Sequence, residues 1–282
     1  MRKKRISSFN SAVTNTRSLT PKITSVDEIF KELDLSVMAV TETWLSGGPV
    51  QEKAFDTFEN DYGIRILNRN RRTRGGVAIL YRSLQIGLKE YRFRRKNHEI
   101  LAARGFITRN KRPFYIFVAY IKPSMSSIRK NELLDLIIDA IMDIKAREAN
   151  ACICVTGDFN RLSPSAITDA HPSLVTVDSP PTRKNAVLDI MICNFAANIE
   201  NVGISASLIN ENGVESDHGI LYMEAKFEHM HDFKWISYKT RVITEEGKQR
   251  FTSFLTNVDW ESLMLGTICL GGYCTRKNEY FE

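Results

Sequence analysis

Residues 151–160 read Ala-Cys-Ile-Cys-Val-Thr-Gly-Asp-Phe-Asn, an apolar run that ends in polar side chains. Residues 151–156 have the composition of a buried strand, and Asp158 and Asn160 follow at its end. Burying a polar side chain costs free energy unless it binds something. Two polar residues that directly follow a core strand in the sequence therefore indicate a functional site. The arrangement is typical of layered α/β domains, in which loops at strand ends carry the chemistry.

The same pattern occurs at two other places in the chain. The apolar residues 37–40 lead into Thr41-Glu42-Thr43-Trp44-Leu45, and Ser216-Asp217-His218-Gly219 precedes the apolar residues 220–222. Carboxylate and amide oxygens suit a hard cation such as Mg²⁺, and a histidine can stabilise phosphoryl oxygens. We therefore expect metal-assisted phosphate chemistry. Three further polar residues at expected strand ends join this group: Asn15, Tyr120 and Asp189.

Each of these residues also has a plainer interpretation when it is taken alone. Glu42 could be a surface residue, Tyr120 a half-buried core tyrosine and Asn15 a turn residue. It is their combination, in this order and spacing, that predicts a site.

Apolar periodicity predicts alternating helices and strands. We expect amphipathic helices, because apolar residues recur every three to four positions, and buried strands, because short apolar runs are bounded by turn residues. Together these elements predict an α/β domain that ends near residues 226–230. The helices are expected at about 20–33 and 127–146, and the strands at 35–40, 77–81, 100–107, 114–120, 151–156, 187–192 and 219–227, with a weaker first strand at 6–13.

Composition limits the class of protein. Hydrophobic residues make up 43% of the 282 residues and aromatic residues 10%, which predicts a globular core. No run approaches the roughly 18 apolar residues of a membrane span, so we expect no membrane partner. The five cysteines form no CxxC pair, which favours free thiols in a reducing intracellular compartment. The basic residues 1–5 are either a solvated terminus or a nuclear address, and we expect the nucleus.

Positive charge is concentrated in one part of the chain. Residues 61–112 hold fifteen Lys or Arg against three Asp or Glu, and the rest of the chain then carries a net charge of −6. A solvated face is the plainer interpretation, but arginine predominates here, and its guanidinium pairs with phosphate in a fork geometry. This composition favours a nucleic-acid-binding face. Its densest part holds Arg69, Arg71, Arg72 and Arg74.

Seven short segments between about residues 10 and 228 together carry a family resemblance. They are residues 15–19 (Asn-Thr-Arg-Ser-Leu), 41–45, 74–79 (Arg-Gly-Gly-Val-Ala-Ile), 120–123 (Tyr-Ile-Lys-Pro), 157–160, 181–183 with 188–190, and 216–218. The chain resembles the endonuclease/exonuclease/phosphatase superfamily, which includes apurinic endonucleases and DNase I. More narrowly, residues 41–45 and 74–76 resemble the endonuclease domain of non-LTR (LINE-type) retrotransposon polyproteins.

The resemblance implies a DNase I-like, four-layered α/β sandwich of two packed, mostly antiparallel sheets flanked by helices. It further implies an enzyme that cuts one DNA strand with Mg²⁺, which Mn²⁺ could replace. Glu42 would hold the metal with Asn15 and Asp217.

The resemblance also implies roles for the remaining residues. Asp158 would deprotonate the attacking water, and Asn160 and Tyr120 would contact the scissile phosphate. His218, held by Asp189, would stabilise the developing charge. Thr182 and Arg183 would touch DNA beside the cut, although a loop with a solvated arginine is the alternative.

The C-terminal part differs from the rest. We expect an endonuclease domain at residues 1–230 and a helical, linker-like tail at 231–282, with a helix from Glu245 that carries Phe251, Phe254 and Leu255 on one face. The tail resembles the segment that joins endonuclease to reverse transcriptase in retrotransposon polyproteins. Since no Tyr/Phe-x-Asp-Asp motif follows, we expect a truncated copy whose reverse transcriptase would be supplied elsewhere.

Three functions are compatible with the sequence. The first is an active Mg²⁺-dependent DNA endonuclease, and the second is a relic that keeps the fold and DNA binding without turnover. The third is a small-molecule phosphatase, because one fold hosts several phosphoesterase activities. The excess of arginine favours the first over the third.

Overall fold

The computed structural model describes residues 4–45, 62–67, 74–83, 85–107, 112–230 and 245–258. The chain divides into two compact units, Met1–His231 and Asp232–Glu282. The first contains two six-stranded sheets, and the second contains one described helix.

The first sheet has the strand order β11-β12-β1-β2-β4-β3. β1 and β2 are parallel, and all the other neighbours in this sheet are antiparallel. The strands are β1 (Lys4–Asn15), β2 (Val37–Thr41), β3 (Tyr62–Leu67), β4 (Val77–Arg82), β11 (Ile199–Ser205) and β12 (Ile220–Met230).

The second sheet has the order β5-β6-β7-β8-β10-β9. Here β7 and β8 form the single parallel pair, so that each sheet contains one parallel pair at its centre. The strands are β5 (Lys89–Glu90), β6 (Ile100–Ile107), β7 (Arg112–Tyr120), β8 (Cys152–Asp158), β9 (Val175–Thr176) and β10 (Asp189–Cys193).

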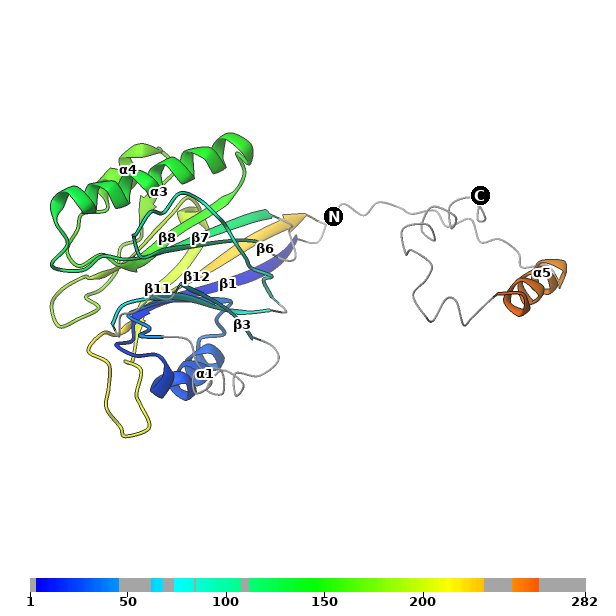
Figure 1. Cartoon of the computed structure of the whole chain (residues 1–282), viewed down its shortest axis with the longest axis horizontal. Coiled ribbons are helices and arrows are strands. Elements are labelled where there is room, and N and C mark those ends of the chain that lie inside the picture. Colours follow the sequence, from blue (N-terminus) through cyan, green and yellow to red (C-terminus); the bar gives the residue numbers. More distant parts are fainter. Residues whose placement is uncertain are drawn as a thin grey trace. The chain divides into compact units, whose positions relative to one another are not determined.

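Helices cover the outer face of each sheet, so the first unit has four layers (Figure 1). The short η1 (Thr20–Lys22) leads into α1 (Ile23–Glu32), which packs on β1, β2 and β4. On the other side, α3 (Ser127–Arg147) and α4 (Ser165–Ala170) pack on the second sheet. The short η2 (Ala196–Asn198) leads into β11. The predicted sandwich of two mostly antiparallel sheets flanked by helices is confirmed.

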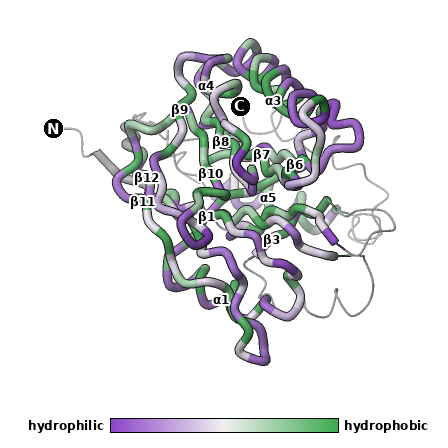
Figure 2. Tube along the Cα trace, turned by 90° about the vertical axis from the view of Figure 1, so that its left-hand side faces the viewer, coloured by the Kyte–Doolittle hydropathy of each residue, from purple (hydrophilic) through white to green (hydrophobic). Residues whose placement is uncertain are grey.

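The core lies between the two sheets and continues beneath the helices. In β2, Val37 and Ala39 face the second sheet, whereas Met38 and Val40 face α1. A strand that is buried on both faces needs apolar residues throughout, which is why the central strands appear in the sequence as continuous apolar runs. Figure 2 shows the resulting green strands in the interior and the alternation of green and purple along α3 that is expected of an amphipathic helix.

Three cysteines of these strands are buried free thiols, as the sequence predicted: Cys152, Cys154 and Cys193. Among the described residues, no helix is both long enough and apolar enough to cross a membrane.

In the second unit, α5 (Glu245–Thr256) forms at the predicted position. Its apolar residues Phe251 and Phe254 are 55% and 53% exposed. The predicted amphipathic helix is therefore present, with its apolar side chains open to solvent.

Candidate active site

The site lies at one edge of the sandwich, where strands from both sheets end or begin. The two parallel pairs, β1–β2 and β7–β8, bring their carboxyl ends to this edge. The antiparallel strands β10 and β12 start there, because each runs opposite to its neighbour. This topology gathers the predicted residues of both sheets: Asn15, Glu42, Tyr120, Asp158, Asn160, Asp189 and His218.

Asn15 joins two carboxylates. Its Nδ2 donates to Glu42 Oε1 at 3.0 Å and to Asp158 Oδ2 at 2.8 Å, although the two residues come from opposite sheets. Glu42 Oε1 also accepts from the Tyr120 hydroxyl at 2.6 Å, and Glu42 Oε2 accepts from Trp44 Nε1 at 3.3 Å. The weak first strand thus does place Asn15 in the site.

The backbone around Glu42 is strained. Glu42 and Trp44 have φ angles of 51° and 53°, in the left-handed region that side chains other than glycine seldom adopt. Backbone bonds from Ser18 and Leu19 to the carbonyls of Glu42 and Thr43 hold this turn in place. Strain of this kind persists only where the surroundings enforce it, and it clusters at functional sites.

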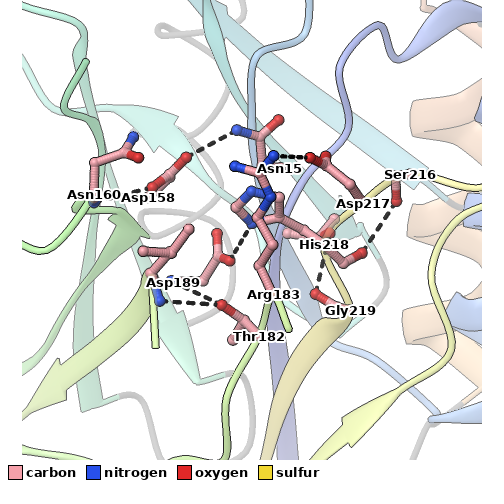
Figure 3. Close-up of polar contacts among 12 residues, drawn as sticks. Asn15, Asp158, Asn160, Thr182, Arg183, Asp189, Ser216, Asp217, His218 and Gly219 are labelled. Carbon is pink, nitrogen blue, oxygen red and sulfur yellow. Dashed lines mark hydrogen bonds and ion pairs between the residues drawn. The ribbon is translucent and has the colours of Figure 1, made fainter. Parts of the chain in front are cut away.

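His218 and Asp189 form a buried pair on the other side of Asp158. His218 Nδ1 lies 2.6 Å from Asp189 Oδ2, and the Asp189 side chain is fully buried (Figure 3). The Thr182 hydroxyl accepts from the backbone N–H groups of Leu188 and Asp189 at 3.2 and 3.1 Å. Thr182 is only 3% exposed, so it supports the strand that carries Asp189. This burial argues against the predicted DNA contact of Thr182.

The surroundings raise the pKa of both Asp158 and His218. Burial, and then the negative charge of Asp189, raise the pKa of Asp158 to about 7. Burial by itself would lower the pKa of His218, but the hydrogen bond to Asp189 and the charges of Asp189, Asp158 and Asp217 outweigh it and raise that pKa. Asp158 is thus suited to accept a proton near neutral pH, and His218 to remain an imidazolium.

Asp217 is held by two arginines. Its carboxylate pairs with Arg17 at 3.3 Å and with Arg183 at 2.5 Å, so it links the turn after β1 to the 181–186 loop (Figure 3). The predicted metal ligand Asp217 therefore has two guanidinium groups as neighbours, and ligation by Asp217 stays a prediction.

Two sets of residues could hold a cation. One is the buried triad of Asp158, Asp189 and His218, whose ligand atoms lie within 4.8 Å of one another. In this triad Asp189 already binds His218, and a cation would have to compete with that bond. The other set is Glu42, Asp158 and Asn15, where two carboxylate oxygens lie within hydrogen-bond distance of one amide nitrogen.

The second set fits Mg²⁺ better. Its two carboxylates supply oxygen ligands beside one another, and Asn15 could add its own oxygen by giving up the bond that Oδ1 accepts from the Arg17 N–H at 3.1 Å. Glu42 also borders the open cleft, which suits an ion that keeps several of its waters.

A cleft of about 640 Å³ lies beside Glu42. Arg74 lies over the Trp44 ring, with its guanidinium carbon 5.6 Å from the ring centroid. The predicted DNA-binding residue Arg74 thus borders the site, whereas the predicted Arg69, Arg71 and Arg72 lie outside the described residues. The cleft is lined by Arg17, Glu42, Trp44, Arg74, Gly75, Tyr120, Lys122, Pro123 and Ser124.

Sequence reasoning missed two supporting residues. Lys22 is buried, and its Nζ donates to the Thr16 carbonyl at 2.6 Å, so it fixes the turn that follows Asn15. Glu99 is buried as well, and its carboxylate accepts from the Gly76 N–H at 2.7 Å. Both act on the main chain, which leaves no side-chain pattern to find. Their only sequence signal is a charged residue beside an apolar run.

Two mixed sheets under helices define the four-layered α/β sandwich class, and a cluster of carboxylate, amide and imidazole groups lies where the central strands of both sheets meet. The chain belongs to the Endonuclease/Exonuclease/phosphatase family, whose sequence profile matches residues 7–183. Members of this family are hydrolases that act on phosphodiester bonds, and they generally use divalent metals. No curated protein sequence matches the chain.

Solved structures share the fold. A humanized D. rerio TDP2 has a TM-score of 0.58 at 12% identity, with 77% of this chain and 98% of that chain covered. A Bacteroides thetaiotaomicron mannosyl-6-phosphatase has a TM-score of 0.60 at 12% identity over 76% and 98% of the chains. The endonuclease domain of TRAS1, a telomere-specific non-LTR retrotransposon, has a TM-score of 0.54 at 11% identity over 78% and 98%. At these identities the likeness shows the fold alone.

Proposed function

We propose that this protein is a Mg²⁺-dependent endonuclease of the retrotransposon type that nicks one strand of DNA. The observation that carries the proposal is the pairing of Asp158 with Glu42 through Asn15, beside the buried His218–Asp189 pair. These groups supply a proton acceptor, a place for a cation and a fixed imidazolium within one cluster.

The side chains have complementary roles on a bound phosphodiester. Asp158 takes the proton of the attacking water, since the pKa of its carboxyl is raised to about 7. His218 stabilises the negative charge that develops on the phosphoryl oxygens, and Asp189 fixes the orientation of its ring.

Asn160 positions the phosphate, and Tyr120 positions Glu42. Asn160 is anchored by its Nδ2, which donates to the Ile121 carbonyl at 2.7 Å, and the second N–H of that amide can donate to a phosphate oxygen. The Tyr120 hydroxyl orients Glu42.

Glu42 and Asn15 would hold Mg²⁺, with Mn²⁺ as a possible substitute and Asp217 as a further candidate ligand. A bound divalent ion supplies positive charge at the phosphoryl oxygens in the transition state.

DNA is the proposed substrate because cations surround the cluster. Arg17, Arg74 and Lys122 line the cleft beside Glu42, and Arg183 pairs with the same Asp217 oxygen as Arg17. A nuclear location and a reverse transcriptase supplied from elsewhere are further proposals that rest on the resemblance to retrotransposon endonucleases.

A small-molecule phosphatase is the second candidate, and the structural likeness to a mannosyl-6-phosphatase favours it. A relic that binds DNA without turnover is the third. The hydrogen-bonded cluster supports an active enzyme over a relic, because Asp158 and His218 each keep a buried hydrogen-bond partner, Asn15 and Asp189.

Plasmid nicking separates the three candidates. Purified protein with Mg²⁺ should convert supercoiled plasmid to the open circular form, and EDTA, Asp158→Ala and His218→Ala should each abolish the conversion. Intact plasmid together with hydrolysis of sugar phosphates would identify a phosphatase. Plasmid that is bound but never cut, with no other substrate hydrolysed, would identify a relic.

A further inference from the structure

A second cleft, of about 670 Å³, opens on the other side of the catalytic residues. Arg161 and Lys184 are exposed on its walls, and Arg183 belongs to it as well. Among the described residues that line the cleft, none is acidic. They are Pro123, Asn160, Arg161, Arg183, Lys184, Asn185, Ala186 and Leu188.

The backbone that carries these cations has a constrained conformation. Arg161 follows Asn160, and the two have φ angles of 65° and 45°. Lys184 has a φ of 51° at the tip of a tight turn that is closed by backbone bonds between Arg183 and Ala186 at 2.9 and 3.1 Å. Three left-handed residues around one cleft indicate a backbone held against its preference, which is typical of binding loops.

In the second cleft Arg183 pairs with Asp217, and no described residue forms an ion pair with Arg161 or Lys184. A third cleft, between residues 91–96 and α3, also contains cations: Arg92, Arg94, Lys96 and Arg147. There four acidic side chains face the cations, so the cleft neutralises itself. They are Glu132, Asp135, Asp139 and Asp143.

The first and second clefts adjoin at Pro123, which lines both. Glu42 and Tyr120 border the first, and Asn160 borders the second, so residues of the catalytic cluster line both clefts and cations line each of them. A phosphomonoester places one phosphate at such a cluster and has nothing for the outer cations to bind. A polynucleotide has phosphates on both sides of the one that reacts.

We propose that Arg161 and Lys184 form a phosphate-binding subsite for the polynucleotide backbone in the second cleft, whereas Arg17 and Arg74 lie in the first. This inference rests on the proposed nuclease function and specifies its substrate as a polymer that spans both clefts. The subsite positions the chain by its phosphates and makes no contact that depends on base sequence.

The test compares two charge-removal variants with the wild-type protein. Arg161→Asn with Lys184→Asn removes both cations, and asparagine tolerates the left-handed backbone at these positions. The control is Lys31→Gln with Arg147→Gln, which also removes one lysine and one arginine. These two residues are exposed near the C-terminal ends of α1 and α3, and each pairs with an aspartate four residues before it. Thermal unfolding confirms that all the proteins are folded.

Two substrates are used with each protein. One is supercoiled plasmid with Mg²⁺ at 50–200 mM KCl, and the other is bis(p-nitrophenyl) phosphate, a diester with a single phosphate. We expect the Arg161/Lys184 variant to lose roughly tenfold or more in kcat/KM on plasmid, mainly through KM. The slope of log(kcat/KM) against the logarithm of the KCl concentration should become shallower by about 1–2. Its activity on the small diester and the control variant's activity on both substrates should stay within twofold of wild type.

The other possible results either contradict the subsite or separate a failure of the subsite from a failure of the proposed function. Unchanged plasmid kinetics in the Arg161/Lys184 variant overturn the subsite, and so does an equal loss on both substrates, because that would mean a structural or catalytic role. If the wild-type protein does not nick DNA, the proposed function fails. Fluorescence anisotropy with a duplex oligonucleotide in EDTA then decides: weaker binding by this variant alone keeps the subsite, and equal binding overturns it.

Discussion

Asp158 carries two opposing demands, since it is buried almost completely and yet must accept a proton. Its oxygens accept from the Asn15 side chain at 2.8 Å and from the Asn160 backbone at 3.1 Å, which favours the ionised form. Burial and the nearby Asp189 oppose that form more strongly and raise the pKa to about 7. The proposed proton acceptor is therefore a carboxyl whose ionised form is held at a cost to stability.

This cost predicts a pH dependence of stability in the metal-free protein. The folded pKa lies above the usual 3.8, so the folded state binds the proton more tightly than the unfolded chain. The stability cost is absent below about pH 4, grows as the pH rises and is complete above about pH 7. Asp158→Asn should therefore gain stability relative to wild type between these limits, by about 4 kcal/mol at most. Urea unfolding in EDTA from pH 4 to 8 measures the gap.

Asp135→Asn is the control, because it removes a carboxylate from an exposed position on α3 where the side chain is not buried. If the difference in the free energy of unfolding between Asp158→Asn and wild type does not change with pH, the raised pKa of Asp158 is contradicted.

At His218 the prediction concerns catalysis. Asp189 acts through the ring of His218, because its Oδ2 lies 2.6 Å from Nδ1. Asp189→Asn should lower kcat for nicking by about 10²–10⁴-fold with little change in KM, since it removes charge stabilisation from the transition state. The double variant with Asp189→Asn and His218→Ala should have a kcat only slightly lower than that of His218→Ala alone. A double variant whose loss equals the product of the two single losses would show that Asp189 acts independently of His218.

Among the elements, β8 shows how packing fixes the site. Gly157 precedes Asp158 and has a φ of 140°, and an added Cβ would meet the Ala119 carbonyl oxygen of β7 at 1.9 Å. Gly157→Ala must therefore push apart the parallel pair that delivers Asp158. We expect a loss of at least about 3 kcal/mol in the free energy of unfolding, measured with urea.

Gly87 is the matched control for Gly157. No atom lies within 4 Å of a Cβ added there, so Gly87→Ala should change stability by less than about 0.5 kcal/mol. Equal effects of the two substitutions would contradict the close approach of β7 and β8.

The central elements and most of the catalytic cluster could be predicted from sequence, because two-sided burial leaves a continuous apolar run. Val37–Thr41 and Cys152–Asp158 are such strands, and each ends at or beside a site residue. The edge strands β3 and β11 were missed, since their residues are mostly half-buried and polar residues interrupt the pattern. Lys22 and Glu99 were missed because they bind main-chain groups. The second cleft is formed by two separate loops, which no local pattern joins.

On the scale of the molecule, the two units differ in what stabilises them. The three apolar clusters of the first unit extend from Phe9 to Phe227 and include both sheets and their helices. The second unit offers one described helix, α5, with exposed Phe251 and Phe254. Since burial of apolar surface is the main source of stability, the first unit should fold without the second.

A chain that ends after His231 tests this expectation. It should match the full-length protein in the free energy of unfolding to within about 0.5 kcal/mol and in the plasmid-nicking rate to within twofold. A chain that ends after Gly219 is the contrasting case. It lacks β12, which lies between β1 and β11 and pairs with both, so the first sheet would lose a central strand and the protein should not fold. Two results would contradict the expectation: the chain ending at His231 unfolds at a clearly lower urea concentration, or it loses nicking while it remains folded. Residues 232–282 would then contribute to the stability or to the DNA binding of the enzyme. The domain boundary would lie further along the chain.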